Sequence, residues 1–95
     1  PLRVGGDVKA PQLTNRVEPQ YPEAARKARM EGVVILEAII TASGSVEDVK
    51  VLKSVNPLLD AAASRAVQQW RYRPATLNGR AVRVYLTVTV TFNLH

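Results

Sequence analysis

Apolar and polar residues alternate along the last part of the chain. Between residues 84 and 92 the even positions carry Val, Leu or Phe, and the odd positions carry Tyr or Thr. Because successive side chains of a strand point to opposite faces of a sheet, this alternation predicts a strand over residues 82–94 with one buried face. No charged residue, proline or glycine interrupts residues 84–94. At a sheet edge such a strand lacks the usual protection against pairing with other chains, although the same pattern also suits an interior strand.

Two stretches in the middle of the chain are also typical of strands. Residues 33–41 are apolar at odd and even positions alike, apart from Glu37, which predicts a central strand between two neighbours. Residues 42–45 (Ala-Ser-Gly-Ser) predict a turn in which Gly44 takes a positive φ. Residues 46–55 then return as a partner strand whose dense charge is typical of a guarded sheet edge. The charged positions of this strand are Glu47, Asp48, Lys50 and Lys53.

Two helices are expected, each introduced by a proline. Pro22 suits the first turn of a helix that continues to about Met30, and Gly32 is the expected left-handed stop. Residues 56–57 (Asn-Pro) predict an N-cap and first turn, after which apolar residues recur at helical spacing as far as Trp70. A Trp at the end of an apolar helical stripe belongs to a core far more often than to a ligand site.

The first 20 residues contain scattered glycines and prolines between isolated apolar positions, which predicts extended chain. A short edge strand is expected near residues 2–4 or 7–9. Asn78-Gly79 is the strongest turn signal in the sequence, and it leads into the last strand. We therefore divide the chain into an extended linker end, residues 1–18, and one domain, residues 19–95.

Composition narrows the class of protein. The chain has 95 residues, of which 46% are hydrophobic and 22% charged, which fits one small globular domain. The net charge is +5, but the basic residues are spread along the chain and only Arg26, Lys27 and Arg29 form a tight group. The sequence also lacks an aromatic-rich binding strand, so nucleic acid is not the expected partner.

The inventory of reactive side chains argues against catalysis. There is no cysteine, and the only histidine is His95, the last residue, so nucleophilic triads and the common metal sites lack their usual groups. Glu47 and Asp48 are neighbours on a strand and point to opposite faces, so they do not form an acid-base pair. No phosphate-binding glycine motif is present. We expect a binding module with no enzyme activity, no cofactor and no metal.

Several short motifs occur in a characteristic order. They are Tyr21-Pro22-Glu23-Ala24-Ala25-Arg26, Gly32 before a strand, Ser43-Gly44, Leu59-Asp60-Ala61-Ala62, Trp70-Arg71-Tyr72-Arg73-Pro74-Ala75, and Asn78-Gly79 before the final strand. With this set the chain closely resembles the TonB C-terminal domain family over residues 19–94. The Tyr-Pro start and the Trp-Arg-Tyr-x-Pro segment make the resemblance fairly specific.

The resemblance implies an α+β fold with two layers. It implies a three-stranded antiparallel sheet of order 2-1-3 with two helices packed on one face, in the topology α-β-β-α-β. This agrees with the residue pattern, in which the apolar strand is central, the charged strand is a guarded edge and the uncharged last strand is an open edge.

The resemblance also implies a role and a location. Proteins similar to this one are anchored in the inner membrane by an N-terminal helix and cross the periplasm on a proline-rich linker. Their C-terminal domain grips TonB-dependent outer-membrane receptors, and an ExbB/ExbD-like inner-membrane complex supplies the ion-motive force. The chain begins with Pro1, and we expect it to be a periplasmic fragment whose anchoring helix lies upstream.

Two groups of residues are the expected partner-binding site. An extended receptor peptide, the TonB box, is expected to add a strand beside the last strand. The contacting residues on that strand are Val84, Tyr85, Leu86, Thr87, Val88, Thr89, Val90, Thr91 and Asn93. In the family the segment just ahead of Tyr-Pro also contacts the receptor, and here it contains Arg16, Glu18 and Gln20. The acidic Glu18 departs from the family pattern of a neutral polar residue, and two solvated loop charges are the alternative interpretation.

Other functions stay open at this point. The domain is alternatively part of a TolA-like or other periplasmic protein whose partner is another periplasmic protein. An unguarded edge also favours self-association into a homodimer with a continuous sheet. A basic nucleic-acid-binding domain has only the net charge in its favour.

Overall fold

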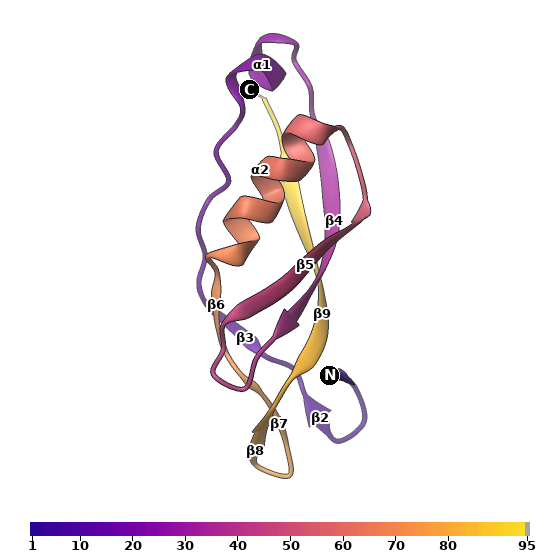
Figure 1. Ribbon diagram of the computed structural model, residues 1–95, viewed down its shortest axis with the longest axis vertical. Helices are drawn as coiled ribbons and strands as arrows, with labels where there is room; N and C mark the ends of the chain where they lie inside the picture. The colour runs from indigo at the N-terminus through magenta and orange to yellow at the C-terminus, as the bar shows by residue number, and fades with distance from the viewer. Residues whose placement is uncertain (95) are drawn as a thin grey trace.

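Three long strands form the main sheet of the computed structural model, which describes residues 1–94 (Figure 1). They are β4 (Gly32–Ile40), β5 (Val46–Lys53) and β9 (Val84–Phe92). β4 lies between the other two and runs antiparallel to both, and its apolar character follows from having a neighbour on each side. A fourth strand, β1 (Leu2–Arg3), pairs in parallel with the start of β9, which gives the order β1-β9-β4-β5.

The structure confirms an α+β fold with two helices and corrects the predicted sheet. The short edge strand predicted near residues 2–4 is present as β1, but it joins the main sheet in parallel, so this sheet is neither three-stranded nor purely antiparallel. On the flank of β9 that faces away from β4, the main-chain groups at the start of the strand would be unpaired without β1, which supplies partners for them.

Five further strands form two small sheets at one end of the molecule. They are β2 (Val8–Lys9), β3 (Gln12–Asn15), β6 (Arg71–Arg73), β7 (Ala75–Leu77) and β8 (Arg80–Val82), ordered β2-β7-β8 and β3-β6. Asn78 and Gly79 both have positive φ, 52° and 79°, and form the predicted turn, but this turn joins β7 to β8. The strand predicted over residues 82–94 is therefore divided at Arg83. Residues 1–18 contribute three short strands, and the domain boundary at residue 19 stays a prediction.

The first helix, α1 (Glu23–Lys27), is shorter than predicted, and the expected stop at Gly32 is wrong. Arg29 takes the left-handed conformation instead, with φ 55°, and the Met30 N–H donates to the Ala25 carbonyl at 2.9 Å. This bond satisfies a carbonyl in the last turn of the helix without a glycine at the C-terminus. Gly32 begins β4, where an added Cβ would lie 2.8 Å from a methyl carbon of Val55. Close packing against Val55 therefore explains this glycine.

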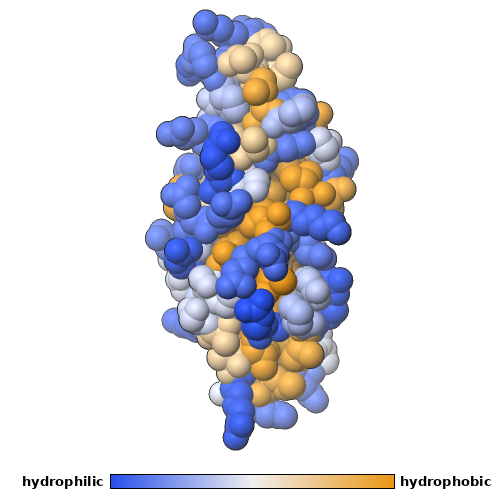
Figure 2. Space-filling view, in the orientation of Figure 1, coloured by the Kyte–Doolittle hydropathy of each residue, from blue (hydrophilic) through white to orange (hydrophobic). Residues whose placement is uncertain are grey.

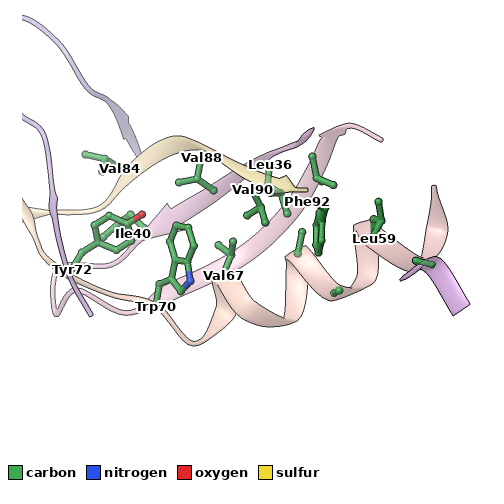
Figure 3. Close-up of a cluster of buried hydrophobic side chains, with 14 of the residues drawn as sticks. Leu36, Ile40, Leu59, Val67, Trp70, Tyr72, Val84, Val88, Val90 and Phe92 are labelled. Carbon is green, nitrogen blue, oxygen red and sulfur yellow. The ribbon is translucent and has the colours of Figure 1, made fainter. Parts of the chain in front are cut away.

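The second helix, α2 (Pro57–Gln68), begins as predicted. The Asn56 side chain accepts a hydrogen bond from the Leu59 N–H at 3.0 Å, and Pro57 occupies the first turn. α2 packs on β4 and β5 and contacts α1. Its apolar face meets the sheet in one buried cluster, shown in part in Figure 3. The labelled side chains there are Leu36, Ile40, Leu59, Val67, Trp70, Tyr72, Val84, Val88, Val90 and Phe92.

Trp70 is a core residue, as predicted, and it ties the N-terminal segment to the core. Its side chain is 4% exposed, and its Nε1–H donates to the Val17 carbonyl at 2.8 Å. A buried indole adds apolar area to the core, and its N–H fixes the position of the carbonyl to which it donates. The path of residues 16–20 along α2 is anchored at this bond.

Tyr72 holds the turn between β4 and β5. The Tyr72 N–H donates to the Gly44 carbonyl at 2.9 Å, and a Cβ added to Gly44 would lie 1.9 Å from the Tyr72 carbonyl oxygen. Gly44 has φ 89°, as its place in the turn predicts. Two main chains therefore meet here at a distance that only glycine permits.

Replacing Trp70 with Ala should lower the free energy of unfolding by about 3–5 kcal/mol, because a large buried ring is lost. Trp70→Phe is the matched control, since it keeps an aromatic ring and removes the bond to the Val17 carbonyl, and it should cost about 1–2 kcal/mol. Urea denaturation of the three proteins measures both values. A loss below about 1 kcal/mol for the alanine variant would contradict the placement of Trp70 in the core.

Gly44→Ala and Gly79→Ala separate backbone strain from the contact with Tyr72. Both positions have similar positive φ, but nothing lies within 4 Å of a Cβ at Gly79. Gly79→Ala should cost about 1–2 kcal/mol from the left-handed conformation alone. Gly44→Ala should cost a further 1–3 kcal/mol or so, because the turn must move away from Tyr72. Equal losses in thermal denaturation would show that the contact is not needed.

Candidate functional site

One flank of β9 is almost unpaired. On its other side β4 pairs with it along its whole length, from Gly32 opposite Phe92 to Ile40 opposite Val84. On the free side β1 pairs only at Val84 and Tyr85. No other strand formed by residues 1–94 pairs with this flank of β9. The stretch from residue 86 to 92 is therefore an open sheet edge.

Two hydrogen bonds show which residues of β9 direct their main-chain groups outward. The Thr41 N–H donates to the Ser45 carbonyl on the β5 side. At this end of β4 the main-chain N–H and C=O groups of odd residues therefore point toward β5, and those of even residues point toward β9. The even residues of β4 pair with the even residues of β9. The main-chain N–H and C=O groups of odd residues in β9 therefore point away from β4. The bond from the Leu2 N–H to the Arg83 carbonyl, 2.9 Å, agrees with this.

The outward groups of Tyr85 lie beside β1, so among residues 1–94 three threonines of β9 are left with main-chain groups that no strand pairs. Thr87, Thr89 and Thr91 each present one N–H and one C=O along the open edge. Their side chains are exposed on the face of the sheet opposite the core. The alternate residues Val88 and Val90 are buried beneath α2 (Figure 3). The edge is therefore held rigidly by its buried face while its hydrogen-bonding groups stay accessible.

The remaining predicted residues of this strand surround that edge. Val84 is fully buried, Tyr85 and Leu86 are half-buried, and Asn93 is exposed just beyond the end of β9. Tyr21 packs edge-on against Phe92, with ring centres 5.4 Å apart, and its hydroxyl donates to the Met30 carbonyl. Burial, with a smaller effect of Glu31, raises the pKa of the Tyr21 hydroxyl. This phenol is therefore protonated at neutral pH and fixes the end of the strand.

The opposite edge of the sheet, β5, is guarded. Asp48 has φ 49° and lies where the register with β4 shifts, between Glu37 opposite Lys50 and Ile39 opposite Glu47. A bulge with charged side chains discourages pairing with another strand. Of the two sheet edges, only β9 combines free main-chain groups with uncharged side chains.

Arg16, Glu18 and Gln20 lie elsewhere, along α2. The Arg16 guanidinium lies 5.2 Å from the Trp70 ring centre and pairs with Glu18. A groove of about 290 Å³ separates this segment from the helix, and Figure 1 shows the chain passing beside α2 on its way from β3 to α1. The groove is lined by Val17, Glu18, Gln20, Ala62, Arg65, Ala66 and Gln69. The predicted site residues therefore fall on two surfaces, the β9 edge and the α2 groove.

No role was predicted from the sequence for Arg3 or Glu37, which form an ion pair beside the start of β9. Arg3 makes an ion pair with Glu37, with 2.8 Å between Nη1 and Oε2, and its Cζ lies 4.3 Å from the centre of the Tyr85 ring. The one available signal was Glu37, a single carboxylate in an otherwise apolar strand. Nothing in the sequence near Arg3 indicates its partner, which lies 34 positions away.

Exposed apolar side chains do not make up the β9 edge. The large ones are Leu2, Val4, Leu13, Val33, Leu52 and Leu58. Figure 2 shows apolar side chains in a band along the middle of one face, bordered by hydrophilic ones. Accessible main-chain groups, not an apolar patch, are therefore the distinctive property of the edge.

The residues described by the structure offer few groups for other chemistry. Within residues 1–94 no three His, Cys, Asp or Glu side chains come together as metal ligands. His95 lies outside the described residues. No helix in residues 1–94 combines the length and the apolar run of a membrane span.

Comparison with known proteins gives a consistent result. The family model described as the Gram-negative bacterial TonB protein C-terminal matches residues 17–94. The chain is 39% identical over 82 residues to the Protein TonB of Xanthomonas campestris pv. campestris, covering 85% of this chain and 37% of that protein. It is 36% identical to the Protein tonB2 of Pseudomonas aeruginosa, covering 81% of this chain and 29% of that protein. The chain thus spans about a third of the length of these relatives.

Solved structures support the same assignment. The solution structure of the Pseudomonas aeruginosa TonB CTD has a TM-score of 0.74 and 28% identity, covering 96% of this chain and 90% of that one. A Helicobacter pylori TonB-CTD structure, residues 179–285, has a TM-score of 0.59 and 26% identity, covering 81% and 70%. Most of the chain is matched in sequence and in fold, and it belongs to the TonB C-terminal domain family.

Proposed function

We propose that this domain is the receptor-binding part of a TonB-type energy transducer. It binds the TonB box of outer-membrane transporters by strand addition to the β9 edge. The observation that carries the proposal is the row of outward N–H and C=O groups at Thr87, Thr89 and Thr91. Strand addition needs such a row on a strand that is itself firmly held, together with side chains that do not repel the incoming peptide.

The energetics favour reversible binding. Each main-chain hydrogen bond contributes about 0.5–1.5 kcal/mol net, and ordering a flexible peptide offsets much of the sum. Specificity then depends on the alternate side chains of the added strand, which meet the exposed threonines and the half-buried Tyr85. A transporter is therefore engaged and released without a tight resting complex.

The same geometry suits the transmission of force. A pull along an added strand loads its hydrogen bonds in shear, so they share the force. Nine residue pairs join β9 to β4, and these pass the load into the centre of the sheet. In the longer parent protein we propose an N-terminal helix in the inner membrane, an ExbB/ExbD-like complex that uses the ion-motive force, and a periplasmic location for this domain.

The α2 groove is proposed as a second contact with the receptor. Glu18 and Gln20 line it, and Arg16 is held beside it by Trp70. A receptor segment in this groove meets charges of both signs, from Glu18 and Arg65. Because Val17 is tied to Trp70, the groove keeps its shape without a partner.

Self-association is the second candidate function, favoured by the same open edge. Two copies that pair through β9 form one continuous sheet across a two-fold axis. Light scattering over a concentration series measures this directly. A dimer that dissociates on addition of TonB-box peptide supports a shared edge, whereas a dimer that leaves peptide binding unchanged uses another surface.

Titration with synthetic TonB-box peptides, followed by NMR, should shift the amide signals of Thr87, Thr89 and Thr91 most strongly. Thr89→Pro removes one outward N–H and should weaken peptide binding at least about tenfold, while an edge strand tolerates the proline. Thr89→Ala is the matched control, because it keeps the N–H and should bind nearly as well as the unmodified domain. Peptide binding that survives Thr89→Pro in a folded domain would assign the interaction to another surface.

A further inference from the structure

The start of the β9 edge is occupied by the chain itself. Residues 1–4, which we call the N-terminal arm, place Leu2 opposite Val84 and Arg3 opposite Tyr85 in parallel register. The Leu2 N–H donates to the Arg83 carbonyl at 2.9 Å. The parallel register places the Leu2 carbonyl beside the Tyr85 N–H. The arm therefore pairs with β9 as an added peptide strand would.

A preformed cation subsite holds the arm. The Glu37 carboxylate lies 2.8 Å from the Arg3 guanidinium, and the Tyr85 ring lies beneath that guanidinium, 4.3 Å from its Cζ to the ring centre. Glu37 and Tyr85 come from adjacent strands, β4 and β9, whose pairing positions both. The Glu37 side chain is only 20% exposed, whereas that of Arg3 is 70% exposed. The sheet thus supplies the two recognition groups, and the arm supplies only the cation.

The arm is attached loosely apart from Arg3. Leu2 and Val4 are 41% and 38% exposed, so neither is fixed in the core. Gly5 and Gly6 follow, with φ 139° and 57°, and nothing lies within 4 Å of a Cβ added at either position. Gly5 and Val8 exchange two main-chain hydrogen bonds, of 3.3 and 3.0 Å, which close the turn behind the arm. An open pocket of about 460 Å³ lies beside the arm, lined by Pro1, Leu2, Ala42, Ala81, Val82 and Arg83. Detaching the arm by rotation about the two glycines therefore costs no core packing and at most the two main-chain bonds between Gly5 and Val8.

We propose that Glu37 and Tyr85 form a binding subsite for an Arg or Lys side chain of an added partner strand, and that Arg3 of the arm fills this subsite in the free protein. Arm and partner then compete for the start of the β9 edge. A partner strand that pairs only with Thr87–Thr91 leaves the arm in place, and one that extends to Val84 displaces it. This inference rests on the proposed function of the β9 edge and adds to it the chemistry of one position of the partner.

Amide hydrogen exchange tests the hold on the arm. Arg3→Gln removes the cation while keeping the length of the chain, and it should speed exchange of the Tyr85 N–H at least about fivefold while Thr89 exchange is unchanged. Arg80→Gln makes the same charge change at an exposed position in β8 and should leave the Tyr85 rate unaltered. An unchanged Tyr85 rate in Arg3→Gln would overturn the role given to Arg3.

Two peptides test the subsite for a partner. Each is a TonB-box peptide lengthened by one residue, Arg or Gln, at the end that NMR places beside Tyr85. In the Arg3→Gln domain the Arg peptide should bind about fivefold more tightly than the Gln peptide, a difference near 1 kcal/mol. The preference should be smaller in the unmodified domain, where Arg3 competes, and should vanish when Glu37→Gln is added to Arg3→Gln.

The outcomes separate this inference from the proposed function. If both peptides shift the β9 amides but bind the Arg3→Gln domain equally, the cation subsite is wrong and the docking edge stands. If neither peptide shifts the β9 amides in any variant, the proposed function is wrong. The inference that a partner's Arg or Lys enters the subsite is then wrong as well. The exchange rate of Tyr85 decides separately whether Arg3 holds the arm.

Discussion

The antiparallel pairing between β4 and β9 positions both the core and the open edge of the sheet. It joins residues 44 to 60 positions apart, from Ile40 with Val84 to Gly32 with Phe92, and extends over the whole of both strands. It places Val88 and Val90 beneath α2, and it brings Glu37 near Tyr85 on the opposite face. Because β9 is fixed by this pairing on one flank and by burial of alternate side chains, its other flank can stay open without loss of order. The open edge of β9 is thus a consequence of how the core is built.

The two sheet edges differ in how they are protected against pairing with strands of other chains. β5 carries charges and a bulge at Asp48, which discourage any added strand. β9 has uncharged threonines and relies on the arm, which covers only its first two positions. A small domain with two open edges would be prone to aggregate, whereas two closed edges would leave no place for a partner strand. The guarded edge β5 and the open edge β9 therefore combine protection against aggregation with the strand addition that we propose.

Much of the fold could be predicted from local patterns, and what was missed depends on distant contacts. The alternation in β9, the Asn56 cap and the burial of Trp70 each follow from residues close in sequence. The left-handed residue after α1 proved to be Arg29, because the hydrogen bonds that close a helix do not require glycine. A short edge strand was predicted near residues 2–4 and is present as β1, but neither its parallel direction nor the strand that it joins was predicted. Its pairing with residues over eighty positions away is visible only in three dimensions.

The same distinction applies to the candidate site. Absence of charge in residues 84–94 predicts a strand able to accept a partner, but only the structure shows which flank is open and that odd residues face it. Arg16, Glu18 and Gln20 were predicted as a second group of receptor contacts from family resemblance alone, and only the structure shows that the bond from Trp70 to Val17 fixes their segment along α2.

The binding that we propose for the edge limits how firmly the arm can be held. A surface ion pair and one cation–π contact contribute about 1 kcal/mol or a little more together, and a two-residue strand adds few hydrogen bonds. A longer or better packed arm would compete with any partner along the whole edge. Without an arm, the edge would be open from Val84 onward. In our proposal, a short strand on a glycine hinge, held mainly by one side chain, covers the start of the edge in the free protein and yields to a partner that brings its own cation.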